Sequence, residues 1–252
     1  MNRLHVERMG AGPDLVMIHG WAMHSGIWNG VRDLLAARYR LHLVDLPGHG
    51  QSPAWASYSF EEITDSIAQI LPRDSIVCGW SLGGQIAIQL ALSVPQQVSK
   101  LVLVATTPCF IKRDDWPWGM EALTLQLFKE NLERHYAQTL NRFFTLQVNG
   151  SHDMTHVLAQ LRSYFFQHAQ PDGQALRAGL QLLLTNDLRT ALTAVAQPVL
   201  LLHGENDVIT HVDAARWMQR QLPDARFIGF PHCGHAPFLT YPDQFIANLY
   251  DL

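Results

Sequence analysis

The chain has 252 residues, of which 48% are apolar and 16% charged, and its formal net charge at pH 7 is −4. This length can bury a sizeable core, and the composition excludes a disordered chain. The negative net charge does not indicate a basic surface that would bind nucleic acid, so we expect no nucleic-acid partner.

Three features of the sequence indicate the compartment. The three cysteines, Cys78, Cys109 and Cys233, are odd in number and widely spaced, which argues against a disulfide framework and favours a reducing cytosol. The first 15 residues carry charges where a secretory signal would be apolar. No run of about 18 apolar residues could span a membrane. We therefore expect a cytoplasmic protein without a membrane partner. Separately, we expect the protein to be a monomer.

Short apolar runs alternate with helical patterns along the chain. The apolar runs are nearly continuous, as in parallel strands buried on both faces. Helical spacing separates them at residues 60–71 and 84–94. This alternation predicts an α/β fold with a mostly parallel central sheet flanked by helices. The predicted strands are residues 15–20, 41–46, 75–79, 101–106 and 198–204.

The alternation stops between Pro108 and Arg189, where the sequence has helical segments such as 120–147 and 154–169 and no strand-like run. Strands resume at Pro198. We interpret residues 108–189 as an all-helical lid inserted into a core formed by residues 1–107 and 190–252. An insertion at the carboxyl edge of a parallel sheet lies where ligands bind.

Ser81 is the candidate nucleophile. It occupies the centre of a G-x-S-x-G pattern, Gly79 to Gly83, between a buried strand and a predicted helix. A strand-to-helix nucleophile elbow requires this context, and its glycines leave room for a sharp turn. A serine that only caps the helix would also fit this position.

A serine hydroxyl needs a base, and the base needs an orienting carboxylate. In this kind of fold the chain order is serine, acid, histidine. Asp207 follows a buried strand, and His235 lies in a loop after the last strand-like run, 226–230. Glu205 is the second choice for the acid, and His232 competes with His235 for the base.

The oxyanion hole requires two backbone amides. One comes from the residue after the nucleophile, here Leu82, and the other from the loop after an early strand. Gly20 allows that loop to turn, and we assign the second amide to Trp21.

No metal or cofactor is expected. His152 and His156 have the spacing of two metal ligands on a helix, but the sequence places no further ligand beside them. The segment 48–50 is too short for a phosphate-binding loop and lacks its lysine.

The segments HGW, VDLPGHGQS, GWSLGG, GENDVI and GHAPF occur in this order, and the chain thereby resembles the α/β-hydrolase superfamily over essentially its whole length. Within the superfamily it is similar to the carboxylesterases of biotin synthesis. Segments that carry this similarity are GWSLGGQIA, PCF followed by RDDWP, RFFTLQ and HAPF.

The resemblance implies hydrolysis of the methyl ester of a pimeloyl chain carried by acyl-carrier protein, with accessory activity on short-chain esters. It gives Ser81 the role of nucleophile, His235 that of general base and acid, and Asp207 that of orienting acid. The resemblance also implies which residues contact the substrate. They are Trp21, Ser81, Leu82 and His235 in the core, and Phe143, Phe144, Thr145, Leu146 and Gln147 on the lid.

The resemblance also implies that lid arginines hold the acidic carrier protein. Arg142 matches one such position, whereas two later positions are Thr155 and Ala159. The segment 108–189 contains eight basic and eight acidic residues, so the whole net charge of −4 lies in the remainder. A lid less acidic than the body permits docking of an anionic protein.

Two other functions use the same fold. A carbon–carbon bond hydrolase acting on ring-cleavage diketones would use the same three catalytic residue types. A ligand-binding protein would keep the pocket without turnover, although an intact Ser81, Asp207 and His235 set favours an enzyme.

Overall fold

The central element of the protein is a seven-stranded sheet, seen in a computed structural model that describes residues 3–252. The strand order is β1-β3-β2-β4-β5-β6-β7, and only β1 runs antiparallel to its neighbour. The expectation of a mostly parallel sheet is confirmed. The strands are β1 Val6–Met9, β2 Asp14–Ile18, β3 Arg40–Val44, β4 Ser75–Trp80, β5 Val98–Val104, β6 Val199–Gly204 and β7 Ala225–Phe230.

Buried apolar side chains explain the strand assignments. All six residues of β4 and all six of β6 are buried. Strands of this kind are covered on both faces, and burying each large aliphatic side chain contributes about 1.5–3 kcal/mol.

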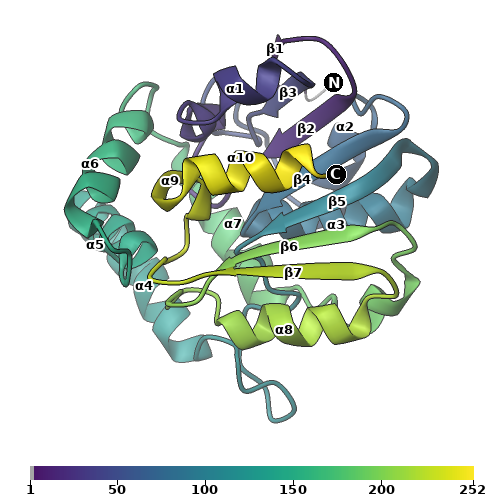
Figure 1. Ribbon diagram of the computed structural model, residues 1–252. Helices are drawn as coiled ribbons and strands as arrows, with labels where there is room; N and C mark the ends of the chain where they lie inside the picture. The colour runs from purple at the N-terminus through teal and green to yellow at the C-terminus, as the bar shows by residue number, and fades with distance from the viewer. Residues whose placement is uncertain (1–2) are drawn as a thin grey trace.

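Helices cover both faces of the sheet (Figure 1). On one face lie α1 Arg32–Ala36 and α10 Pro242–Tyr250, joined where the Tyr250 hydroxyl donates to the Leu34 carbonyl. On the other face lie α2 Phe60–Ala68, α3 Leu82–Ser93 and α8 Val212–Gln221. Short helical turns complete the core: η1 Ser25–Trp28, η2 Pro95–Gln97, η3 Arg189–Ala194 and α9 Pro237–Thr240.

Four helices lie between β5 and β6 in the chain and gather beyond one end of the strands (Figure 1). We call them the inserted helices. They are α4 Ala122–Arg134, α5 Tyr136–Val148, α6 Met154–Phe165 and α7 Gly173–Thr185. No helix within residues 3–252 combines the length and apolar character needed to cross a membrane.

The structure differs from the sequence-based expectations in two places. Strand β1 was not predicted, because it is a partly exposed edge strand without a continuous apolar run. The single helix expected over 120–147 is two helices, α4 and α5, which meet at His135. The backbone of His135 has φ −139° and ψ 52°, which is not helical.

Gly83 provides a test of how tightly α3 packs against the sheet. Replacing a helical glycine with alanine favours the helix by up to about 1 kcal/mol. At Gly83, however, the added Cβ would lie 2.4 Å from the Ile18 carbonyl oxygen and 2.6 Å from that of His19. Overpacking of this kind costs about 1–3 kcal/mol or more. We expect Gly83→Ala to lower Tm by about 5 °C in calorimetry.

Gly173→Ala is the matched control, because that glycine also lies in a helix, α7. Its added Cβ would meet only Arg177 Nη1, at 3.5 Å. Tm should stay the same or rise in this variant, and an equal fall in both variants would contradict the packing argument.

Candidate active site

Ser81 lies at a sharp turn between β4 and α3. Its backbone has φ 56° and ψ −116°, a region that costs a non-glycine residue about 1–3 kcal/mol. The Ser81 amide donates to the Val104 carbonyl over 2.9 Å, and the Ser81 carbonyl accepts from the Gly84 amide over 2.9 Å. These hydrogen bonds hold the strained turn in place.

The glycines around this turn have no room for a side chain. A Cβ on Gly79 would lie 2.2 Å from the Gly83 carbonyl oxygen, and a Cβ on Gly84 would lie 1.9 Å from Thr106 Oγ1. The end of β4 and the start of α3 therefore touch backbone to backbone, and the Thr106 side chain packs against the backbone of Gly84. The sequence pattern at 79–83 thus forms the strand-to-helix elbow that its spacing predicts.

Asp207 and His235 meet beyond the carboxyl ends of β6 and β7. Asp207 Oδ2 lies 2.7 Å from His235 Nδ1, and both side chains are almost fully buried. Asp207 also accepts hydrogen bonds from the amides of Ile209 and Thr210 and from the Thr210 hydroxyl. Of the two acids considered, Asp207 is thus the one that contacts His235, whereas Glu205 lies 3.8 Å from Arg216.

Burial alone would raise the pKa of Asp207. This effect of burial is outweighed by the charge of His235, by the hydrogen bonds from His203 and His235, and by the charge of His203. The pKa of Asp207 therefore lies well below its ordinary value. An ionised Asp207 accepts a hydrogen bond from the Nδ1–H of His235, which keeps the proton on Nδ1 and leaves Nε2 with a free lone pair. This is the tautomer that a general base requires.

Two backbone hydrogen bonds fix His235 further. Its amide donates to the Gln147 carbonyl over 2.7 Å, and its carbonyl accepts from the Trp80 indole over 2.8 Å. Trp80 is 1% exposed and directly precedes Ser81. Sequence reasoning gave Trp80 no role, since nothing in the pattern indicates that its indole reaches a loop 155 residues away.

The loop after β2 lies beside Ser81. A Cβ on Gly20 would lie 3.2 Å from the Ser81 Cβ. Within the described residues, neither the Trp21 amide nor the Leu82 amide donates to another backbone group. Leu82 is the first residue of α3, where an amide has no intrahelical partner. An unpaired backbone amide is what an oxyanion donor requires.

His19 orients the peptide that carries the Trp21 amide. His19 is fully buried, its Nε2 accepts from the Leu46 amide over 3.0 Å, and its Nδ1 lies 2.8 Å from the Gly20 carbonyl oxygen. The Nδ1 proton therefore points at that oxygen. In a trans peptide the carbonyl and the N–H point in opposite directions, so the Trp21 N–H points away from His19. The sequence predicted an oxyanion donor in this loop and gave the His19 side chain no role.

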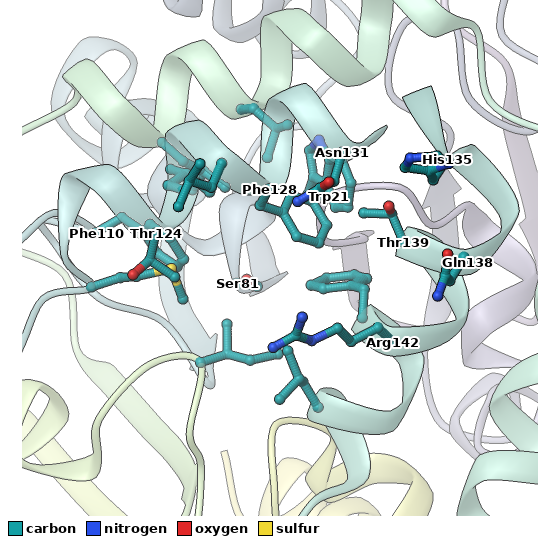
Figure 2. Close-up of a pocket in the computed structure, with 18 residues that line it drawn as sticks. Trp21, Ser81, Phe110, Thr124, Phe128, Asn131, His135, Gln138, Thr139 and Arg142 are labelled. Atoms are coloured by element: carbon teal, nitrogen blue, oxygen red, sulfur yellow. The ribbon is translucent and has the colours of Figure 1, made fainter. Parts of the chain in front are cut away.

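An apolar cavity of about 400 Å³ lies over Ser81 (Figure 2). Its wall includes Trp21. The ring of Phe143 packs edge-on against the Trp21 indole, with the two ring centroids 5.0 Å apart. The polar side chains on the wall come mainly from α4 and α5, and Arg142 extends from α5 into the cavity (Figure 2). The other lining residues are Phe110, Met120, Thr124, Leu125, Leu127, Phe128, Asn131, His135, Gln138, Thr139, Leu146, Leu180, Leu183 and Ile209.

The structure separates the five contiguous residues that were expected on this wall. Phe143 and Leu146 line the cavity, whereas Phe144, Thr145 and Gln147 do not. Phe144 packs against Phe165, the Thr145 hydroxyl donates to the Asn141 carbonyl, and Gln147 is fully buried. A helix turns once in 3.6 residues, so five successive residues of α5 cannot all face one wall.

Leu82 and His235 are also absent from the lining side chains. Both are nearly buried, with exposed fractions of 4% and 2%. The Leu82 side chain packs beside Gly179 of α7. Thr155 and Ala159 are exposed on α6. No cluster of three or more metal-ligating side chains occurs among residues 3–252.

The sheet order, the turn at Ser81 and the Asp207–His235 pair are features of α/β hydrolases. A model of the alpha/beta hydrolase family matches residues 15–248. The chain belongs to this family.

Two relatives with high sequence identity to this chain are both named pimeloyl-[acyl-carrier protein] methyl ester esterase. The protein from Nitrosomonas europaea is 60% identical over 98% of each chain. The protein from Nitrosospira multiformis is 52% identical over 98% of this chain and 96% of its own. Among solved structures, an esterase from Exiguobacterium antarcticum has a TM-score of 0.91 at 25% identity, covering 98% of this chain and 94% of its own.

Two buried histidines near the loop after β2 make stability depend on pH. Burial lowers the pKa of His19 to about 3, with the charge of His49 adding to the effect, and burial lowers the pKa of His49 to about 4. Both side chains are thus neutral in the folded protein at pH 5, whereas unfolded histidine, with a pKa near 6.5, is protonated there. The unfolded state binds more protons, so stability falls as the pH falls below about 6.5.

We expect the free energy of unfolding to decrease between pH 7.5 and pH 5 by about 2 kcal/mol for each of these histidines. Urea titrations at the two pH values measure this decrease. His49→Gln removes one titrating group and should reduce the decrease by about 2 kcal/mol. An unchanged pH dependence in this variant would show that His49 is not held neutral by the fold.

Proposed function

We propose that this protein is a serine carboxylesterase that hydrolyses the methyl ester of a pimeloyl group carried by acyl-carrier protein, as part of biotin synthesis. The observation that carries the chemistry is the buried Asp207–His235 pair, 2.7 Å apart, beside the strained turn at Ser81. The two relatives bearing that esterase name support the substrate. Short-chain esters are accessory substrates.

In the proposed reaction, Ser81 Oγ attacks the ester carbonyl while His235 Nε2 takes the hydroxyl proton. The amides of Trp21 and Leu82 stabilise the oxyanion. His235 then gives the proton to the departing methoxide, which leaves as methanol. Water attacks the acyl-enzyme with His235 as base, the pimeloyl carboxylate is released, and the proton returns to Ser81.

The cavity suits one end of such a substrate. Phe128, Phe143 and Leu146 offer an apolar wall for the methylene chain. Asn131 and Gln138 are among the polar side chains on the α4 and α5 wall (Figure 2), where they can meet the amide groups of the carrier's pantetheine arm. We further propose that residues 108–189 act as a lid over the site.

The proposed location is the cytosol, where acyl-carrier substrates are made. The three cysteines support it, since all are free and buried and none forms a disulfide. We propose that the protein acts as a monomer with acyl-carrier protein as its partner and without nucleic acid.

Ser81→Ala tests the chemistry. Removing the nucleophile should lower turnover of a p-nitrophenyl ester by roughly a million-fold, since the three catalytic groups act as a unit. The protein should remain folded, because the Ser81 hydroxyl makes no packing contact that the change to alanine would remove. Near-normal turnover by a folded Ser81→Ala protein would rule out Ser81 as the nucleophile.

The biological substrate is tested by complementation. The wild-type gene should restore growth without biotin to a strain lacking its own esterase of this kind, and the Ser81→Ala gene should not. If a soluble wild-type protein with esterase activity fails to rescue growth, the biotin assignment is wrong while the esterase chemistry stands. Turnover of a ring-cleavage diketone instead would favour the carbon–carbon bond hydrolase.

Arg142→Glu tests carrier docking. Arg142 lies on the cavity wall, and replacing its positive charge with a negative one should repel the acidic carrier protein. We expect kcat/KM for the carrier-bound ester to fall at least about ten-fold more than kcat/KM for p-nitrophenyl acetate, a difference of about 1.4 kcal/mol.

Arg220→Glu is the control with the same change of charge, because Arg220 is exposed on α8 and does not line the cavity. This variant should resemble the wild type with both esters. Equal losses on both esters in Arg142→Glu would instead assign Arg142 to the structure of the wall.

A further inference from the structure

The loop that carries His235 is bonded to the chain segment that leaves α5. We call residues 147–152 the α5 exit turn. The His235 amide donates to the Gln147 carbonyl over 2.7 Å, and the Gly234 amide donates to Ser151 Oγ over 3.2 Å. The His152 amide donates to the His232 carbonyl over 2.9 Å. Three successive hydrogen bonds therefore join the α5 exit turn to residues 232–235.

The two segments also touch without intervening side chains. A Cβ on Gly234 would lie 2.6 Å from the Asn149 carbonyl oxygen and 2.7 Å from that of Gln147. On the opposite side of the loop, a Cβ on Gly204 would lie 2.0 Å from the Gly234 carbonyl oxygen. The histidine loop is thus confined between the end of β6 and the α5 exit turn.

The α5 exit turn reaches the loop of the acid as well. Asn206 Nδ2 lies 3.4 Å from the Gly150 carbonyl oxygen, and the Asn206 amide donates to the Cys233 carbonyl over 2.9 Å. Gly150 has φ +81°, and a Cβ there would lie 2.4 Å from the Asn206 Cβ. The same turn therefore borders both loops that present the Asp207–His235 pair.

The helix that precedes this turn forms part of the cavity wall through Arg142, Phe143 and Leu146. A displacement of α5 would move the Gln147 carbonyl that holds the His235 amide. The position of the wall and the position of the general base are therefore linked through one short segment of backbone.

We propose that the α5 exit turn positions the general base, and that Ser151 is the positioning residue whose side chain contributes to this. The Ser151 hydroxyl accepts from Gly234, the residue before His235, and lies 3.3 Å from Thr240 Oγ1 at the end of α9. It thereby links the histidine loop to the helix that follows it. The inference rests on the proposed esterase function, because it assigns Ser151 a role only through His235.

Ser151→Ala removes the acceptor of the Gly234 amide. A displacement of a catalytic group by about 1 Å can cost up to a hundred-fold in rate. With a p-nitrophenyl ester we expect kcat to fall about ten-fold, with KM within two-fold of the wild-type value. The rate at which a fluorophosphonate labels Ser81 should fall by a similar factor, because labelling also needs the base, while the labelled fraction should remain complete.

Two further variants separate positioning from a general loss of stability. Ser151→Thr retains the hydroxyl and should restore kcat to within about three-fold of the wild type. Ser99→Ala is the matched control. Ser99 lies at the start of β5, away from the site, and its hydroxyl donates to the Asp74 carbonyl. It should leave kcat and the labelling rate unchanged.

The proposal is overturned if Ser151→Ala keeps kcat within two-fold, or if Ser151→Thr loses as much activity as Ser151→Ala. A fall in the labelled fraction at an unchanged labelling rate would also overturn it, because this would indicate unfolded protein rather than a misplaced base. The proposed function fails separately, if the wild-type protein hydrolyses no ester and Ser81 is not labelled.

Discussion

The strained backbone at Ser81 is the constraint on which the rest of this structure depends. A positive φ of 56° at a serine persists only when the surroundings over-determine it. One part of these surroundings is the end of β5, where the Val104 carbonyl accepts a hydrogen bond from the Ser81 amide. The other part is three glycines, Gly79, Gly83 and Gly84, whose lack of a side chain lets the strand, the turn and the helix pack closely. The parallel sheet supplies all of these contacts, because strand ends that are distant in sequence meet at one edge.

The inserted helices contribute to the position of His235 as well as to the wall of the cavity over Ser81. His235 is held at three points: by Asp207 at Nδ1, by the Trp80 indole at its carbonyl and by the Gln147 carbonyl at its amide. The first two contacts come from the sheet and its edge, and the third comes from the end of α5. A displacement of the His235 backbone must therefore also move a segment of the core or of the inserted helices, while Asp207 fixes the orientation of the imidazole.

The sequence was most informative where local chemistry decides the structure. Continuous apolar runs predicted the parallel strands, and the glycines around Ser81 predicted the elbow, because few other residues tolerate its backbone contacts. Prediction failed where a pattern was short or was shared by neighbours. β1 is a partly exposed edge strand, and the break at His135 interrupts a continuous helical composition. Of the run 143–147, which stays a prediction for substrate contact, Phe143 and Leu146 line the cavity.

By itself the sequence determined the fold class and the sharp turn at Ser81, because both follow from residue type and local spacing. It named Asp207 and His235 as preferred candidates but left Glu205 and His232 as alternatives. Only the tertiary structure decided that Asp207 rather than Glu205 meets His235, that Trp80 and Gln147 hold the histidine backbone, and which residues of α5 face the cavity. The reason is physical. These contacts join segments up to 155 residues apart, and their geometry depends on how strand ends and helices pack, which spacing along the chain does not specify.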